Sequence, residues 1–167
     1  MNYRWQINER GYANVIRADG CWVDGLCYDI SVSDEARLDL SEGVAKGAYE
    51  KKDMPVEIRR AVPSLYRRPT AWIMAHGGVK EVLDATVDEQ HVEIPTTVEP
   101  EVLVYVSETF ITNGDPWDEY IDRINLGLMD AELLGMDAAY VANCIRPFIP
   151  EGSSEAPSSS PEQPGTP

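Results

Sequence analysis

The sequence predicts an α+β fold in a single domain spanning residues 1–150. Segments 13–16, 49–58 and 102–106 have the length and the β-branched or aromatic content of strands. The region after residue 115 has apolar residues at helical spacing. Because 43% of the 167 residues are hydrophobic, the chain has enough apolar surface to form one compact core.

In the amino-terminal third, the sequence predicts a hairpin followed by a short helix. Segments 13–16 and 22–30 are both strand-like, and Ala18-Asp19-Gly20 between them has the composition of a turn. Ser33 is a suitable N-cap for an acidic helix over 34–39. That helix leads into a Ser-Glu-Gly turn, after which the strand at 49–58 begins.

In the carboxy-terminal third, the apolar run 102–106 is short enough to be a strand in a sheet. Asp115-Pro116 then combines a capping side chain with a residue fixed at helical φ, which predicts a helix start. Gly135 is the expected C-cap, and a second helix over 137–144 should stop before Pro147. The first helix should bury a stripe made of Tyr120, Ile124, Leu128 and Ala131.

Two regions have no clear periodic pattern. Residues 59–100 are interpreted as an irregular insertion, with a helix over 79–85 following the Gly77-Gly78 break. Residues 151–167 are rich in Ser, Pro, Gly and Glu, and are predicted to be a disordered tail because they offer little apolar surface to bury.

Charge and cysteine content limit the classes of partner. Fourteen basic and twenty-nine acidic side chains give a net charge of -15, which disfavours nucleic acid and anionic membrane surfaces as partners. Three cysteines without paired spacing indicate reduced thiols. The start of the chain lacks the design of a signal peptide, and no apolar run approaches the roughly 20 residues of a membrane span. The predicted location is the cytoplasm.

Several common catalytic and metal-binding motifs are absent. The sequence has no nucleophile elbow, no phosphate-binding loop and no dinucleotide-binding fingerprint. His76 and His91 are isolated, so surface or packing roles are expected for them. No metal and no cofactor are predicted.

Glu42 is the strongest candidate for a catalytic residue. It lies in a turn between a helix and a strand, where loops often present side chains to a cleft. Among twenty-nine acidic residues, the ordinary alternative is a solvated surface carboxylate. Composition alone does not distinguish these two roles.

The motif around Glu42 provides further information. Residues 38–44 read Leu-Asp-Leu-Ser-Glu-Gly-Val and are followed by Gly-Ala-Tyr at 47–49. With the blocks at 5–15, 23–28 and 115–127, this sequence resembles the γ-glutamylcyclotransferases, most of all their fungal branch, some of whose members act on glutathione adducts. The resemblance covers most of residues 5–150 outside the insertion.

The resemblance implies a small mixed β-barrel packed by helices, with Glu42 as the catalytic acid–base at one mouth. By position it also implies that Tyr120, Tyr105, Tyr49 and Gly43 contact the substrate, although packing is the alternative for the tyrosines. The implied reaction closes the α-amine of a γ-glutamyl group onto its own γ-carbonyl and releases 5-oxoproline and a free amine. One carboxylate can move the protons that this step requires.

One feature of the family is not found in this sequence. Members normally open with a strand ending in a Tyr-Gly-Ser-Asn loop whose backbone amides hold the γ-glutamyl group, and no such motif occurs here. We therefore expect a barrel without its first strand, arising either from a late start of the reading frame or in a truncated relative. A non-catalytic binding or interaction protein is the alternative function, and a scaffold with coincidental matches is the third. The sequence leaves open which γ-glutamyl compound is preferred and what the oligomeric state is.

Overall fold

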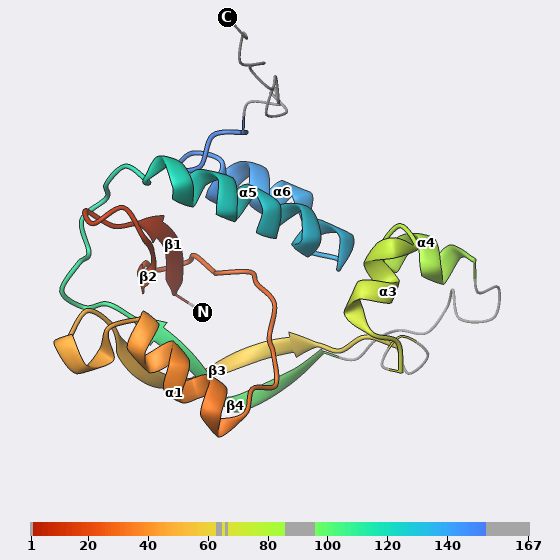
Figure 1. The fold of residues 1–167 in the computed structure, drawn as a ribbon, viewed down its shortest axis with the longest axis horizontal. Coiled ribbons are helices and arrows are strands. Elements are labelled where there is room, and N and C mark those ends of the chain that lie inside the picture. The colour runs from red at the N-terminus through yellow and green to blue at the C-terminus, as the bar shows by residue number, and fades with distance from the viewer. Residues whose placement is uncertain (1, 63–64, 66, 86–95, 153–167) are drawn as a thin grey trace, which may run out of the picture.

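The computed structural model describes residues 2–62, 65, 67–85 and 96–152, and has the α+β composition that the sequence predicts (Figure 1). Two antiparallel pairs of strands, called the first and the second hairpin below, form its sheets, although residues 60–95 separate the two strands of the second. In the first, β1 (Tyr3–Ile7) pairs with β2 (Ala13–Arg17). In the second, β3 (Glu50–Arg59) pairs with β4 (Thr96–Val106).

The helices lie on both sides of these hairpins. Figure 1 shows α1 against β3 and β4, α5 and α6 on the other side of β1 and β2, and α3 and α4 beyond the far end of β3. None of the helices in the described part of the chain is both long and apolar enough to span a membrane. The helical elements are α1 (Val32–Ser41), the 3-10 turn η1 (Val44–Lys46), α3 (Thr70–Ala75), α4 (Val79–Asp84), α5 (Asp118–Leu133), α6 (Ala138–Tyr140) and the π-helical turn η2 (Val141–Ile145).

The first hairpin differs from the prediction. The segment 13–16 is a strand, but its partner is β1 and not residues 22–30, which form no regular secondary structure. The tight turn at 8–12 explains this pairing, because the Asn8 amide donates to the Tyr12 carbonyl and Gly11 adopts φ 83°. The predicted turn at 18–20 does form, but no strand follows it. After the turn, only the Cys21 carbonyl bonds back to the first hairpin, where it accepts from the Asn2 amide.

Helix α1 starts earlier than the sequence indicated. Its N-cap is Ser31 and not Ser33, and Ser31 forms a capping box with Asp34. No residue of α1 is buried, and Val32 and Leu40 are 85% and 80% exposed. The helix is fixed to the second hairpin mainly by polar contacts, in which Lys51 Nζ donates to Glu35 at 2.8 Å and to Asp39 at 2.9 Å.

The strand predicted at 49–58 is confirmed as β3, one residue later at each end. The strand predicted at 102–106 is the last part of β4, which begins at Thr96. The register shifts between Met54 and Val56, on either side of Pro55, as expected where proline cannot donate to the ladder.

The main core forms between the first hairpin and the carboxy-terminal helices. Ile7 and Ile149 are fully buried there, and Leu128 brings α5 into the same cluster. The helix predicted from Asp115-Pro116 begins at Asp118. Leu128 and the half-buried Tyr120 and Ile124 of its predicted stripe pack in this core, and the fourth stripe residue, Ala131, is buried. The second predicted helix is divided into α6 and η2.

The region predicted to be an irregular insertion contains two helices in its described part. α4 confirms the helix expected near 79–85, whereas α3 was not predicted. Both pack around a second, smaller core formed by Val62, Leu65 and Ile73, against which Leu134 also packs. Residues 86–95, which include His91, and the tail from 153 lie outside the described residues.

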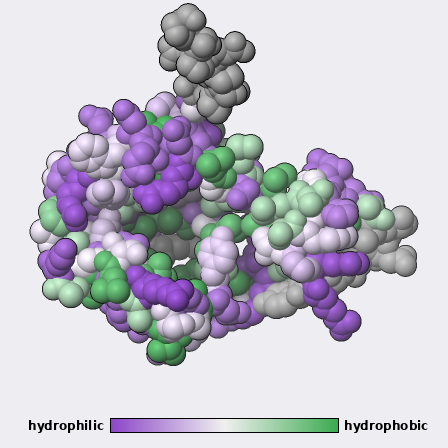
Figure 2. Space-filling view, viewed as in Figure 1, coloured by the Kyte–Doolittle hydropathy of each residue, from purple (hydrophilic) through white to green (hydrophobic). Residues whose placement is uncertain are grey.

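The predicted barrel was wrong for the described residues, where two separate two-stranded sheets replace a closed sheet. Where β2 approaches β4, a side chain occupies the place of a ladder. The Asn14 Oδ1 accepts from the Ser107 amide at 2.9 Å, and its Nδ2 donates to the carbonyls of Ser107 and Phe110. These bonds give the backbone amide and carbonyl of Ser107, directly after β4, hydrogen-bond partners without a ladder between β2 and β4. Figure 2, viewed as in Figure 1, shows a hollow between α5 and the second hairpin.

Candidate functional site

Glu42 lies in a turn defined by two glycines. It is the C-cap of α1, and Gly43 follows at φ 65°, where the left-handed conformation ends the helix. Gly47 has φ 67° and ends the short η1 turn, while the Ala48 amide donates to the Gly43 carbonyl. A side chain at Gly43 would place Cβ 3.2 Å from that of Ala48. The structure therefore assigns Gly43 a backbone role, and its predicted contact with substrate remains a prediction.

The Glu42 carboxylate is half-buried and forms no hydrogen bond or ion pair with any described residue. Burial raises its pKa above the usual value, because it disfavours the charged form. Its position at the carboxyl end of α1 acts in the same direction, since helix C-termini carry partial negative charge. A carboxyl with these properties can take up and release a proton closer to neutral pH than a surface glutamate.

Tyr49 and Tyr120 lie close enough to Glu42 for its charge to affect them. Burial is the main reason that the pKa of Tyr49 rises to about 12, and the Glu42 carboxylate adds to this increase. The pKa of Tyr120 is also raised, again first by burial and further by Glu42. The structure thus brings together three of the predicted site residues.

Both tyrosine hydroxyls are positioned by the backbone of Ala13 in β2. The Tyr49 hydroxyl donates to the Ala13 carbonyl at 2.6 Å and accepts from Asn8 Nδ2 at 3.3 Å. The Tyr120 hydroxyl instead accepts from the Ala13 amide at 3.3 Å. The Tyr49 proton is therefore used within the protein, whereas the Tyr120 proton has no acceptor among the described residues.

Tyr105 belongs to a different group of contacts. Its hydroxyl donates to Asp39 Oδ1 at 2.8 Å, and it pairs with Lys51 across the second hairpin. Burial and the Asp39 carboxylate together raise the pKa of Tyr105 to about 12, while hydrogen bonds from Lys51 and Tyr105 lower that of Asp39. These contacts fix α1 to the sheet. The contacts of Tyr105 therefore do not place it beside Glu42, and its predicted contact with the substrate remains a prediction.

A cluster of buried polar side chains beside the tyrosines was not identified from the sequence. Gln6, Asn8 and Asn14 are at most 2% exposed, and Gln6 and Asn14 pair across β1 and β2. Asn8 and Asn14 have hydrogen-bond partners, but neither polar atom of the Gln6 carboxamide has one among the described residues. The spacing of Gln6 and Asn8, two residues apart at the end of β1, was the available sequence signal, since extended backbone places such residues on one face.

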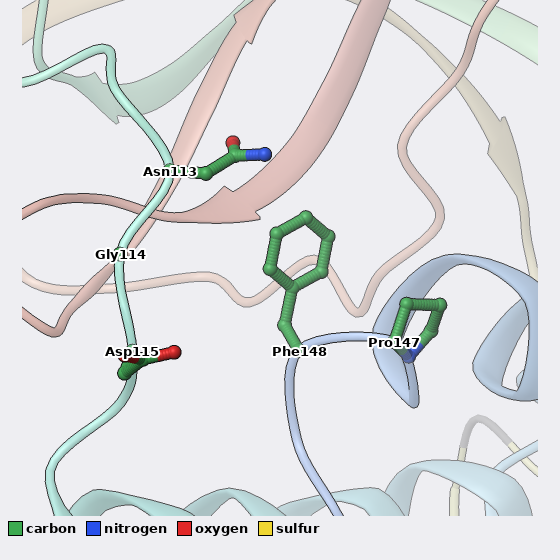
Figure 3. A pocket seen from close by; sticks show the side chains of 5 residues that line it. All are labelled: Asn113, Gly114, Asp115, Pro147 and Phe148. Atoms are coloured by element: carbon green, nitrogen blue, oxygen red, sulfur yellow. The ribbon is translucent and has the colours of Figure 1, made fainter.

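Two cavities in the described part of the chain are not lined by Glu42. One, of about 300 Å³, is lined by Asn113, Gly114, Asp115, Pro147 and Phe148, and Figure 3 shows Asn113 and Asp115 extending from their loop toward Phe148. The other, of about 340 Å³, shares Pro147 and Phe148 with it. Neither is lined by Glu42 or by the predicted tyrosines.

The other residues considered from the sequence have ordinary surroundings. His76 stacks on Trp72 with ring centroids 3.9 Å apart, and its Nδ1 contacts the Trp72 carbonyl at 2.8 Å, which is a packing role. Within the described ranges, no group of three or more His, Cys, Asp or Glu side chains is arranged to hold a metal ion. Cys21, Cys27 and Cys144 are free thiols.

Comparison of the chain with protein-family models, with curated proteins and with solved structures found no match. The resemblance to γ-glutamylcyclotransferases therefore remains an expectation from the sequence. A functional proposal depends on that resemblance together with the geometry around Glu42.

Proposed function

We propose that the protein is a cytoplasmic γ-glutamylcyclotransferase in which Glu42 is the acid–base. The observation that supports this most is the half-buried Glu42 carboxylate, which has a raised pKa and no partner among the described residues. The buried Tyr49 and the half-buried Tyr120 lie close enough to sense its charge. Carboxyls of this kind are uncommon on ordinary surfaces and frequent where protons are transferred. The substrate class is a γ-glutamyl peptide, a γ-glutamyl amine or a glutathione-type compound.

In the proposed reaction, the α-amine attacks the γ-carbonyl carbon of the same residue and forms the ring C–N bond. Glu42 takes the proton that the amine loses. The same carboxyl then gives this proton to the departing nitrogen as the original γ-amide C–N bond breaks. No net proton, electron or co-reactant is required, and because the attack is intramolecular the protein mainly positions groups and moves protons.

Tyr120 is the proposed hydrogen-bond donor to the substrate. Its hydroxyl already accepts from the Ala13 amide, so its proton can be donated to a carboxylate or carbonyl oxygen. Tyr49, whose proton goes to the Ala13 carbonyl, is better suited to holding the site in shape. Replacing Tyr120 with Phe should therefore raise KM for a γ-glutamyl substrate by about tenfold, the value of one hydrogen bond.

The test of the acid–base assignment is release of 5-oxoproline from γ-glutamyl dipeptides and from glutathione. Glu42→Gln keeps size and shape but cannot accept a proton, so kcat should fall by about 100-fold or more. Glu132→Gln is the matched control, because Glu132 is exposed on α5. Circular dichroism and thermal unfolding of both variants show whether the fold is retained.

Two results would contradict the proposal in different ways. Full turnover by a folded Glu42→Gln protein would show that another group moves the protons. Absence of 5-oxoproline from every γ-glutamyl compound would favour a non-catalytic binding protein. The binding function is also supported by the two cavities described above, since neither of them is lined by Glu42.

A further inference from the structure

The 340 Å³ cavity is a candidate binding site separate from Glu42. It lies between β1, the chain that follows β2, and the last helical turn, and six of its lining residues are Arg4, Trp5, Cys21, Trp22, Cys144 and Phe148. Its volume is at the small end of the range for small-molecule pockets, so it suits a ligand of one or two rings.

The walls of this cavity favour an aromatic ligand. Trp5 and Phe148 pack edge to face with ring centroids 5.6 Å apart and form one fixed wall. Trp22 lines the cavity and is still 58% exposed, in a segment without secondary structure. A flat ring placed beside Trp22 would cover apolar surface that no part of the described protein covers.

Arg4 is the only charged residue among the described residues that line this cavity, which favours an anion as the ligand. Arg4 is half-buried, and none of the ion pairs formed within the described chain includes it. Its Nη2 donates to Asn113 Oδ1 at 3.2 Å, which leaves the other guanidinium N–H groups without acceptors among the described residues. Asp115 lines the neighbouring cavity but forms no ion pair with Arg4. The Arg4 guanidinium is therefore available to bind an anion.

We propose that this cavity binds a small aromatic carboxylate, with its ring between Trp22 and the Trp5–Phe148 pair and its carboxylate on the Arg4 guanidinium. Planar guanidinium and carboxylate groups can form two parallel hydrogen bonds. Such binding is independent of γ-glutamyl turnover, because neither Glu42 nor its two tyrosines lines the cavity.

The three free cysteines provide a test within one chain. Cys21 and Cys144 line the cavity, whereas Cys27 is exposed and does not. The full chain is alkylated with iodoacetamide in the presence of 1-naphthoate, and the rate at each cysteine is measured by peptide mass spectrometry. With 1-naphthoate at ten times its Kd from calorimetry, alkylation of Cys21 and Cys144 should slow about tenfold, and that of Cys27 should not change. Unchanged rates at all three cysteines, or equal slowing at all three, would overturn the proposal.

Ligand analogues and variants test the two recognition elements separately. The neutral isostere 1-naphthamide should bind about tenfold more weakly than 1-naphthoate, and Arg4→Gln should weaken 1-naphthoate to the same extent. Arg37→Gln is the control, because Arg37 is an exposed arginine on α1. Trp22→Ala should also weaken binding, whereas Tyr28→Ala, which removes another exposed aromatic residue of the same segment, should not. Equal affinity for the amide and the carboxylate would rule out the anionic class.

Discussion

Glu42 shows how one residue can contribute to the site at a cost in stability. Its pKa is raised in the folded protein by burial, so the carboxyl stabilises the fold while it is protonated. That contribution is fully present below the unfolded pKa of about 4.3 and is lost as pH rises through the folded pKa. At neutral pH the ionised, half-buried carboxylate therefore destabilises the protein.

Glu42→Gln should accordingly be more stable than the parent chain at pH 7 and equal to it near pH 4. The neutral amide resembles the protonated acid, so the difference should appear only where Glu42 ionises. Urea unfolding between pH 4 and pH 7 measures this, with Glu132→Gln as the control that should show no such trend. A Gln variant less stable than the parent at pH 7 would mean that the carboxylate has a stabilising partner.

Gln6 is a second residue whose side chain does not fit a purely structural role. It is completely buried, and neither atom of its carboxamide has a partner among the described residues. Unsatisfied buried polar groups each cost roughly 1–3 kcal/mol, so Gln6→Leu should increase the free energy of unfolding by about 1 kcal/mol.

Asn14→Leu is the matched control for that experiment. Asn14 is also buried, but it makes three hydrogen bonds to the backbone of Ser107 and Phe110. Its replacement should cost roughly 2–4 kcal/mol, because the amide and carbonyl of Ser107 lose their partner. Urea unfolding compares the two variants, and a loss of stability in Gln6→Leu would reveal a partner such as a buried water.

Among the elements, α1 determines where Glu42 lies, and it is held by few contacts. It has no buried residue, so its stability depends on the cap at Ser31 and on the contacts of Lys51 and Tyr105 with its acidic side chains. Movement of α1 would move Glu42, since Glu42 caps its carboxyl end. The geometry of the site is therefore coupled to the stability of a surface helix.

Ser31→Ala should lower the free energy of unfolding by about 1 kcal/mol, the usual cost of losing an N-cap. Ser33→Ala should cost clearly less, because Ser33 does not cap the helix although it contacts the Ser31 hydroxyl. Chemical denaturation of both variants distinguishes the cap seen in the structure from the one that the sequence suggested. A larger loss for Ser33 would reverse the assignment.

At the scale of the whole molecule, the described chain has two cores of unequal size. The larger one joins β1 to α5 and the carboxy-terminal turns, and the smaller one holds α3 and α4 together. Gly78 is at the contact between them, with φ 94° and no room for a side chain, since a Cβ would lie 2.5 Å from the Leu133 carbonyl oxygen. Apart from this contact, the two cores have no described residue in common, so the smaller one should open independently of the larger one.

Ile73→Ala tests this independence. Removing a buried isoleucine side chain costs roughly 2–5 kcal/mol, and here the loss should fall on α3 and α4. Amide hydrogen exchange should accelerate in those two helices and remain unchanged in β1 and in α5 before its last turn. Uniform acceleration across the chain would show instead that both cores unfold as one unit.

The sequence by itself determined those elements that depend on local chemistry. The strand at 49–58, most of α5 with its apolar stripe, and the turn at Glu42-Gly43 follow from residue composition and spacing along the chain. Glu42, Tyr49 and Tyr120 were also named together from the sequence, through a family resemblance and not through any distance between them.

Only the tertiary structure decided how distant segments combine. The sequence predicts the segment 22–30 as the partner of β2, but the tight turn at Gly11 selects β1 instead. The Asn14 side chain keeps the two hairpins separate, and the contact with Asp39 directs Tyr105 toward α1. The unpaired amide of Gln6 and the cavity between Arg4 and Trp22 likewise arise from residues that lie far apart in sequence. These features depend on long-range packing and burial, which local propensity does not encode.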